Sequence, residues 1–543
     1  MTKYMKQLSQ LPSVEINRIR SQMRDALAVR EITPADCWSI SCDIFAVTRK
    51  KVSETTLKRI FGFANSTQSF SRYTLNAIAE YFEIRYGIMP REIVCREDSV
   101  LANMQIITLT RLNTIERRCG IPYQMTIDRK RAEKEFEDFF SGPSTMMAIA
   151  ALPGHGKTIM LSHLAKRYFA TSDRPFSASA LLFLSATNFH NADNTSLTLE
   201  DYLRKTLFIG PEVLLTDYLA GIVPIGSKIL IIIDGFDEAH WAGTAKTLLY
   251  DSIIDFTGSL GKTNGVKMML SMRPLAWARF SERMKRVPEM ETITYGSGPV
   301  EGRAFTDFLQ LDEEEGREIC RRADIGIYDR FSIELRKFLA RPVNLQVLIC
   351  HPNRMVLLGF RSGIILCELI CSVVKERIYG SNYYTEKIHF LKRIVSLTSQ
   401  ATTGCTVPKD DLMADMHRFR NAYMELLSDG ILIEERIFTG GHPRESIGFT
   451  DPWLFDYFIF ASLLERFNGL PASDAAQHIN GTYSGDRRLN HLRALARHGI
   501  RTREYGFLEF SALSLAPKEK DELALFIAEN VCYNRHSHGD ALA

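Results

Sequence analysis

The chain has 543 residues, of which 45% are hydrophobic and 24% are charged, an ordinary composition for about three or four globular domains. This composition excludes an intrinsically disordered chain, a collagen-like repeat and a disulfide-stapled miniprotein. The 67 Lys and Arg residues and 64 Asp and Glu residues give a net charge of +3, which argues against a general polyanion binder. Residues 1–90 nevertheless carry 13 basic and 8 acidic side chains, a local charge of +5 that leaves −2 for the rest. Any attraction to nucleic acid should therefore concentrate in residues 1–90.

The cysteines and the apolar segments bear on the compartment. The ten Cys include no Cys-x-x-Cys pair and no partners at the spacing of a zinc site, so most are expected to be buried free thiols in a reducing compartment. The first twenty residues lack the apolar core of a signal peptide. The most apolar long stretch, residues 357–374, contains Arg361 and Glu368 and is better explained as a buried helix than as a membrane span. We therefore expect a cytoplasmic protein.

The N-terminal part has the pattern of short helices. Over residues 14–86 these helices alternate with polar turns; Ser53 is a plausible N-cap of one that ends at Gly62. Residues 71–82 repeat this pattern with apolar residues on one face. Residues 91–125 have no strong pattern and are expected to connect domains.

From about residue 126 the pattern changes to helices that alternate with continuous apolar runs. Helices are expected over residues 128–140 and 158–169. The apolar runs predict a parallel sheet covered on both faces. Its expected strands are residues 146–150, 180–184, 229–233 and 267–271.

After Pro299 the pattern is mainly helical. Residues 411–463 then show the order helix, turn, two short β-like runs (431–438 and 446–450) and helix, which is typical of a winged helix. Residues 471–543 have a helical pattern and no recognisable motif. The chain has no internal period of 20–50 residues, which argues against a repeat array.

The strongest candidate site lies between a predicted strand and a predicted helix, and it fits the phosphate-loop pattern. Small residues allow backbone N–H groups to surround phosphates, and the following helix adds the partial positive charge of its N-terminus. Lys157 would reach the β- and γ-phosphates, and the hydroxyl of Thr158 would coordinate Mg²⁺. Ala151 stands where the first glycine of the pattern usually stands. The expected nucleotide-binding residues are Ala151, Leu152, Pro153, Gly154, His155, Gly156, Lys157 and Thr158.

A second element is the apolar run over residues 228–233, which ends in an acidic cluster. Asp234, at the carboxyl end of the predicted strand, would hold Mg²⁺ directly or through water. Asp237 and Glu238 follow closely, where one of them would polarise the attacking water. A solvated acidic turn is the alternative, but the order of this element after the phosphate loop favours a nucleotide site.

A third element follows the next predicted strand, which ends at Ser271 and Arg273. This is the edge at which open α/β sheets bind ligands. Arg273 would sense the γ-phosphate there, unless it is only a surface arginine in a turn.

Together these elements resemble the NACHT branch of the STAND NTPases, signalling ATPases related to AAA+ proteins. The most specific feature is Asp-Gly-x-Asp-Glu after a strand, over residues 234–238, which is similar to the NACHT form of the Walker B motif. The resemblance implies an α/β P-loop NTPase core with a parallel, AAA+-like sheet. It also implies ATP or ADP with Mg²⁺ as cofactors and slow ATP hydrolysis.

Two later segments extend the resemblance. Residues 338–345 are similar to the proline turn of the family's helical domain, in which Pro342 would pack near the nucleotide base. Residues 448–461 are similar to the segment that closes the family's winged helix. Asp451 stands there in place of a histidine that contacts ADP, and a carboxylate would repel phosphate unless a cation intervened.

Residues 52–63 and 73–81 resemble a small bacterial helix-turn-helix module. Such a module binds DNA or serves as a protein contact, and both interpretations stay open. If it binds DNA, two groups of residues would face the groove and the backbone phosphates. The first group is Thr55, Thr56, Lys58 and Arg59, and the second is Arg49, Lys50 and Lys51.

The expected organisation is an α-helical N-terminal domain, the α/β core, a helical domain, a winged helix and a short helical C-terminal domain. The expected segments are 1–90 (helix-turn-helix-like domain), 91–125 (linker), 126–299 (NACHT nucleotide-binding domain), 300–360 (helical domain), 361–470 (winged-helix region) and 471–543 (short C-terminal helical domain).

This combination resembles bacterial NLR-like proteins that defend against phage. The resemblance implies a nucleotide-gated switch that binds and slowly hydrolyses ATP and oligomerises on activation. An ATP-dependent, DNA-binding transcription regulator is the alternative. A scaffold with a degenerate site is disfavoured by the intact Lys157, Thr158, Asp234 and Glu238. The sequence shows no nuclease or protease signature, and it leaves the trigger, the effector and the oligomer size open.

Overall fold

The computed structural model describes most of the chain in two compact units. One unit contains residues 1–102 and 204–213, and the other contains residues 103–203 and 214–543. The described residues are 33–61, 63, 74, 77–78, 80–81, 84, 97–170, 176, 179–189, 198–211, 213–224, 226–236, 243–261, 265–295, 310–398, 406–439, 442–467, 472–504, 506, 510 and 513–539.

The described part of the first unit includes the helices α3 (Asp36–Thr48) and α4 (Glu54–Phe61). Ser53 caps α4 as predicted, because its Oγ accepts a hydrogen bond from the backbone N–H of Thr56 at 3.2 Å. The two helices share a small core with Tyr81. Gly62 and most of residues 71–82 lie outside the described residues.

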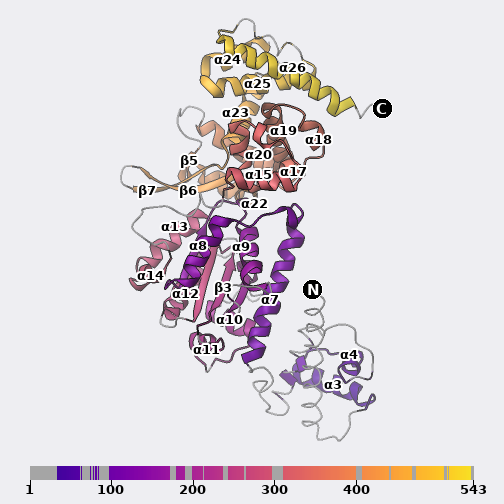
Figure 1. Cartoon of the computed structure of the whole chain (residues 1–543), viewed down its shortest axis with the longest axis vertical. Helices are drawn as coiled ribbons and strands as arrows, with labels where there is room; N and C mark the ends of the chain where they lie inside the picture. The colour runs from indigo at the N-terminus through magenta and orange to yellow at the C-terminus, as the bar shows by residue number, and fades with distance from the viewer. Residues whose placement is uncertain are drawn as a thin grey trace. The chain divides into compact units, whose positions relative to one another are not determined.

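The second unit is built on a parallel sheet, of which β3 is labelled in Figure 1. Its strand order is β1-β4-β3-β2. The strands are β1 (Met146–Ala150), β2 (Ala180–Ser185), β3 (Ile229–Asp234) and β4 (Val266–Met272). Almost every strand residue is buried, as expected for a parallel sheet covered on both faces. The predicted α/β core is therefore confirmed.

Helices cover both faces of this sheet. One face packs with α7, α8 and α9 in a core that includes Phe136, Phe139 and Leu161. The opposite face contacts α12, where Thr257 lies against Met146. The helices that surround the sheet are α7 (Glu97–Arg118), α8 (Lys130–Ser141), α9 (Lys157–Ala165, continued by a π-helix over Lys166–Ala170), α10 (Leu199–Leu207), α11 (Leu215–Gly221), α12 (Gly243–Leu260), α13 (Pro274–Met284) and α14 (Glu289–Ile293).

Helix α7 lies within residues 91–125, where the sequence has no strong pattern. It is a 22-residue helix rather than an irregular connection. Some of its contacts with the sheet are polar: the hydroxyl of Thr108 donates to the carbonyl of Leu181 at 2.8 Å and accepts from the N–H of Phe183 at 3.0 Å. A helix that docks through polar side chains as well as Leu112 and Ile115 has no clean apolar stripe, so periodicity does not reveal it.

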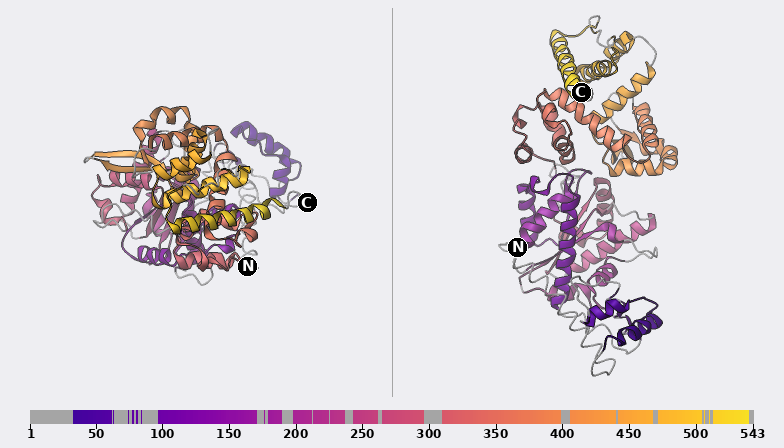
Figure 2. Two further views of the ribbon diagram at one scale, coloured as in Figure 1. Left: turned by 90° about the horizontal axis from the view of Figure 1, so that it is seen from above. Right: turned by 90° about the vertical axis from the view of Figure 1, so that its right-hand side faces the viewer.

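The remainder of this unit is mainly helical, and Figure 2 shows the three C-terminal helices packed together (yellow). One hydrophobic core contains residues from Leu311 to Tyr533. The buried helix expected over residues 357–374 is interrupted, since α18 ends at Leu357 and α19 begins at Ser362. The helices are α15 (Glu313–Arg322), α16 (Ile333–Leu339), α17 (Pro342–Ile349), α18 (Arg354–Leu357), α19 (Ser362–Val374, continued by a π-helix over Lys375–Tyr379), α20 (Tyr384–Thr398), α24 (Ala472–Thr482), α25 (Gly485–Thr502) and α26 (Pro517–Gly539).

Between α20 and α24 lies a small antiparallel sheet with flanking helices, here called the hairpin region (residues 406–466). Its strand order is β5-β7-β6, and β6 and β7 form a hairpin over the two runs that the sequence predicts. Its elements are β5 (Thr406–Pro408), α21 (Met413–Arg418), α22 (Arg420–Ser428), β6 (Leu432–Thr439), β7 (His442–Phe449) and α23 (Pro452–Arg466).

None of the helices in the described part of the chain combines the length and the apolar character needed to cross a membrane.

Candidate nucleotide-binding site

The predicted phosphate loop connects the end of β1 to the start of α9. Gly154 and Gly156 have φ angles of +78° and +85°, which side chains rarely adopt. A Cβ on Gly154 would also lie 2.5 Å from Cγ1 of Val343. Both glycines are therefore required by the path of the loop, and Gly154 also by the close approach of α17.

Lys157 is buried at the first position of α9. Its Nζ donates to the carbonyls of Ala151 at 2.7 Å and Leu152 at 3.2 Å. The ammonium group thus lies inside the loop, where the N-terminus of α9 adds partial positive charge. This set of donors fits the phosphates of a nucleotide.

The second predicted element, Asp234, ends β3 and is 3% exposed. Its Oδ2 accepts from the hydroxyl of Thr158 at 2.9 Å, and its Oδ1 accepts from the hydroxyl of Ser271 at 2.6 Å. The structure therefore brings together Thr158 and Asp234, the two residues predicted to coordinate Mg²⁺. Mg²⁺ prefers oxygen ligands and takes only a few of them from the protein, the rest coming from water and phosphate, so these two residues fit it.

Ser271 also positions the backbone that follows Asp234. Its Oγ accepts from the N–H of Gly235 at 2.9 Å, and its carbonyl accepts from the N–H of Phe236 at 2.9 Å. Asp237 and Glu238, which the sequence predicts to polarise water, lie outside the described residues. Their role stays a prediction.

Arg273 follows β4 and precedes α13. Since β4 lies between β1 and β3, Arg273 is at the same edge of the sheet as the phosphate loop and Asp234. This position agrees with the predicted γ-phosphate sensor, whose role stays a prediction.

The chain was compared with known protein families. The NACHT domain model matches residues 146–293, the segment that contains the phosphate loop, Asp234 and Arg273. Residues 146–293 form a NACHT domain. The chain therefore contains a P-loop NTPase domain, as the sequence predicts.

Comparisons with curated proteins and solved structures give no further support for a function. No curated protein matches this chain. Among solved structures, a chain of Drosophila ORC bound to DNA is similar over 75% of this chain and 99% of that chain, at 12% identity and a TM-score of 0.28. A likeness at that level carries no functional argument.

Helix α17 contacts the phosphate loop of the NACHT domain directly. The N–H of Val343 donates to the carbonyl of Gly154 at 3.1 Å. Pro342, the first residue of α17, lies beside Gly156, since a Cβ there would be 3.5 Å from its Cγ. Pro342 is thus at the loop, and its predicted contact with the nucleotide base stays a prediction.

Arg341 joins the loop to the hairpin region. Its Nη2 lies 3.3 Å from the carbonyl of Pro153 and 3.4 Å from that of Gly430. Its Nη1 lies 3.6 Å from Oδ2 of Asp451, a side chain that is 2% exposed. Arg341 therefore pairs with the unexpected carboxylate, and the charge of Arg377 adds to the compensation.

Asp451 has two further polar contacts. Its carboxylate caps α23 by accepting from the N–H of Trp453 at 3.1 Å, and it also accepts from Nδ2 of Asn344 at 3.3 Å. Burial raises the pKa of Asp451, and Arg341 opposes that shift. The sequence indicates that a cation is needed beside Asp451. Arg341 is 110 positions away from Asp451 in the chain, so only the fold identifies it as that cation.

His155 is an unusual member of the loop because it is 1% exposed. Neither ring nitrogen has a hydrogen-bond partner among the described residues. Burial, together with the charges of Arg341, Lys157 and Arg129, lowers the pKa of His155 to about 3. The ring is therefore neutral at pH 7.

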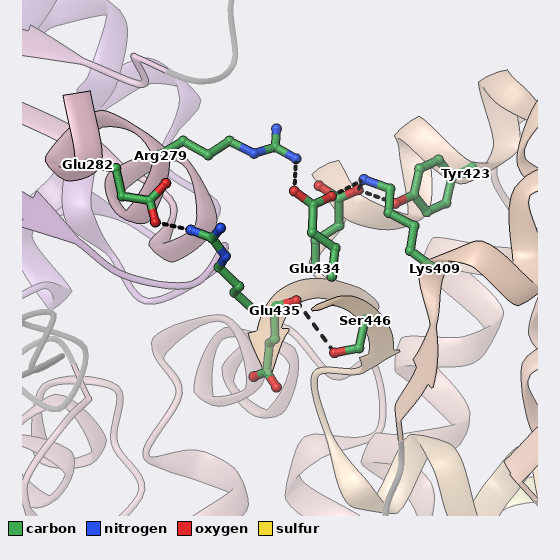
Figure 3. A network of polar contacts seen from close by, with 9 residues as sticks. Arg279, Glu282, Lys409, Tyr423, Glu434, Glu435 and Ser446 are labelled. Carbon is green, nitrogen blue, oxygen red and sulfur yellow. Dashed lines mark hydrogen bonds and ion pairs between the residues drawn. The ribbon is translucent and has the colours of Figure 1, made fainter. Parts of the chain in front are cut away.

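A second contact joins the NACHT domain to the hairpin region (Figure 3). Arg279 and Glu282 of α13 pair with Glu445 and Arg436 of the β6–β7 hairpin. Lys409 extends this network within the hairpin region, with its Nζ 2.9 Å from Oε2 of Glu445. Charged side chains from both parts thus meet at this interface.

The basic residues predicted to face DNA are partly compensated. Lys58 pairs with Glu54 at 2.5 Å, and Lys50 pairs with Glu80. Arg59 is exposed. Binding of DNA by this unit stays a prediction.

Proposed function

We propose that this chain is a cytoplasmic, nucleotide-gated ATPase switch that oligomerises on activation and acts in bacterial defence against phage. The observation that carries the proposal is the position of Arg341. It contacts the phosphate loop through Pro153 and the hairpin region through Gly430 and Asp451. One side chain thus links the nucleotide-binding loop to the C-terminal part of the chain.

The site residues divide the binding of a magnesium nucleotide among them. Lys157 and the N-terminus of α9 hold the phosphates, and Thr158 and Asp234 hold the metal ion. Bound Mg²⁺ would neutralise charge on the phosphates during hydrolysis. Glu238 or Asp237 would orient the attacking water, and slow hydrolysis would reset the switch.

The nucleotide and the C-terminal part of the chain both contact the phosphate loop, and gating follows from this shared contact. Lys157 donates to loop carbonyls, and α17 packs on Gly154 and Gly156. Reorientation of Lys157 toward phosphate changes the loop that α17 and Arg341 contact. A nucleotide that stabilises one arrangement of the loop more than another therefore shifts the equilibrium between closed and open forms.

The ion pairs at α13 suit a reversible switch. The Arg279, Glu445, Arg436 and Glu282 side chains are 27–52% exposed. Pairs with this exposure contribute about 0.2–1 kcal/mol each. They favour the closed form while a trigger with modest binding energy is still able to open it.

The decisive experiment measures both ATP binding by the purified protein and protection of cells against phage. Cells that express the wild type, Lys157→Ala or Asp234→Ala are challenged with a panel of phages, and the purified proteins are tested for ATP binding and assembly. We expect both variants to lose ATP-dependent assembly and protection. If both variants bind ATP and protect cells as the wild type does, the proposed nucleotide-gated switch is contradicted.

A further inference from the structure

Arg111 is a residue of α7, outside the 146–293 segment that matches the NACHT domain. Its Nη2 lies 2.8 Å from Oδ2 of Asp234, the same oxygen that accepts from Thr158. The guanidinium therefore occupies one side of the predicted metal-binding carboxylate. Neither the family match nor the sequence pattern assigns it a role.

The backbone of α7 is anchored close to Arg111. Thr108, one turn earlier, bonds to both Leu181 and Phe183 of β2. The guanidinium carbon of Arg111 also lies 5.9 Å from the centre of the Phe183 ring. Arg111 can therefore exchange one partner for another by changing its side-chain rotamer, while α7 stays in place.

A cavity of about 420 Å³, lined by both polar and apolar residues, adjoins this ion pair. None of the residues that line it is acidic. Nε of Arg111 is buried and has no hydrogen-bond partner among the described residues. The lining includes two arginines and four hydroxyl groups, from Arg111, Arg118, Thr114, Thr158, Ser185 and Thr187.

The guanidinium and hydroxyl groups of this lining favour an anionic ligand. Guanidinium groups bind phosphate oxygens with two parallel hydrogen bonds, and hydroxyl groups complete the contacts. Thr158 belongs both to the cavity and to the phosphate loop. The cavity is therefore continuous with the place where the distal end of a nucleotide's phosphate chain would bind.

We propose that Arg111 distinguishes nucleoside triphosphates from diphosphates by exchanging Asp234 for the terminal phosphate. The inference rests on nucleotide binding at the phosphate loop. A divalent cation held by Thr158 and Asp234 repels a guanidinium bonded to the same carboxylate oxygen. With a triphosphate, Arg111 has a new anionic partner in the cavity; with a diphosphate, it has none beyond Asp234.

The test measures equilibrium binding of Mg²⁺·ADP and of a slowly hydrolysed Mg²⁺·ATP analogue to the full chain by titration calorimetry. The proteins are the wild type, Arg111→Ala, Arg111→Gln and Arg117→Ala. Arg117 is an exposed arginine of the same helix, so its variant is the matched control. We expect both Arg111 variants to lose roughly 10- to 100-fold in affinity for the triphosphate and less than threefold for ADP, and Arg117→Ala to lose neither.

Other results overturn the proposal in distinguishable ways. Equal losses for both nucleotides, or none, contradict the discrimination. Tighter binding of both would mean that Arg111 only blocks the metal site. If the wild type binds neither nucleotide, the proposed function itself fails and this inference with it. Arg111→Gln decides the question if Arg111→Ala does not fold.

Discussion

The replacement Arg341→Met tests the contact that links the phosphate loop to the hairpin region. It removes the charge while keeping a long side chain, and it leaves the carboxylate of Asp451 buried. Removing one partner of a buried ion pair costs about 3–5 kcal/mol. The hydrogen bonds that Asp451 accepts from Trp453 and Asn344 remain, so we expect the lower end of this range.

The assay is thermal unfolding of the nucleotide-free protein, followed by a double-mutant cycle. The entropy of unfolding scales with size, and for a unit of roughly 430 residues it gives about 1 °C per kcal/mol, so a loss of about 3 kcal/mol lowers Tm by roughly 3 °C. Asp451→Asn keeps the size and the cap of α23 but removes the charge. The double variant Arg341→Met/Asp451→Asn contains neither charge, so it should be more stable than Arg341→Met, with a coupling energy above about 1 kcal/mol. A Tm for Arg341→Met within 1 °C of the wild type, or additive effects in the cycle, would refute the reasoning.

Three further predictions concern the loop and the interface. Lys157→Ala should weaken ATP binding at least tenfold, whereas Asp234→Ala should abolish its dependence on Mg²⁺; titration with and without a chelator measures both, and unchanged binding in either variant contradicts the site. Arg279→Glu should favour assembly at lower ATP concentration by repelling Glu445, whereas Arg279→Lys, which keeps the positive charge, should retain the wild-type response in light scattering. His155 has a pKa of about 3 in the folded protein, below its unfolded value of about 6.5, so the unfolded state binds more protons in this window and stability is lost as the pH falls below about 6.5. At pH 5 this loss is about 2 kcal/mol; His155→Phe should unfold with a smaller pH dependence between pH 7 and 5, and an equal dependence would assign the effect to other groups.

The four strands and the phosphate loop were predictable because their signals are local. Continuous apolar runs identify buried parallel strands, and the loop needs glycines at fixed spacing. Thr158 and Asp234 were both predicted to hold Mg²⁺ from the motif pattern, and the structure brings the two residues together. That part of the site depends on the topology of the sheet, which the sequence pattern predicts.

The unpredicted part of the site depends on contacts between distant residues. Arg111 lies in a segment without a clear apolar period, and its partner Asp234 is 123 positions away. Arg341 and Asp451 are also far apart in the sequence. Such pairs leave no local pattern, because a buried arginine and an exposed one look alike in a single sequence.

The boundaries expected after residue 300 stay predictions. The core that contains Leu311 and Tyr533 is continuous through α19, α23 and α25. Helices that share one core have no polar linker to mark a domain boundary. The changes of pattern in the sequence identify helices and strands there.

The most direct measurement is the mass of the purified full chain in solution with Mg²⁺·ADP and with a slowly hydrolysed Mg²⁺·ATP analogue, alongside Lys157→Ala. We predict the mass of one chain with ADP, a multiple of it with the ATP analogue once the trigger or Arg279→Glu relaxes the closed form, and no assembly by a protein that also carries Lys157→Ala. The same mass with both nucleotides in the Arg279→Glu protein, or undiminished assembly when Lys157→Ala is added, would contradict nucleotide gating.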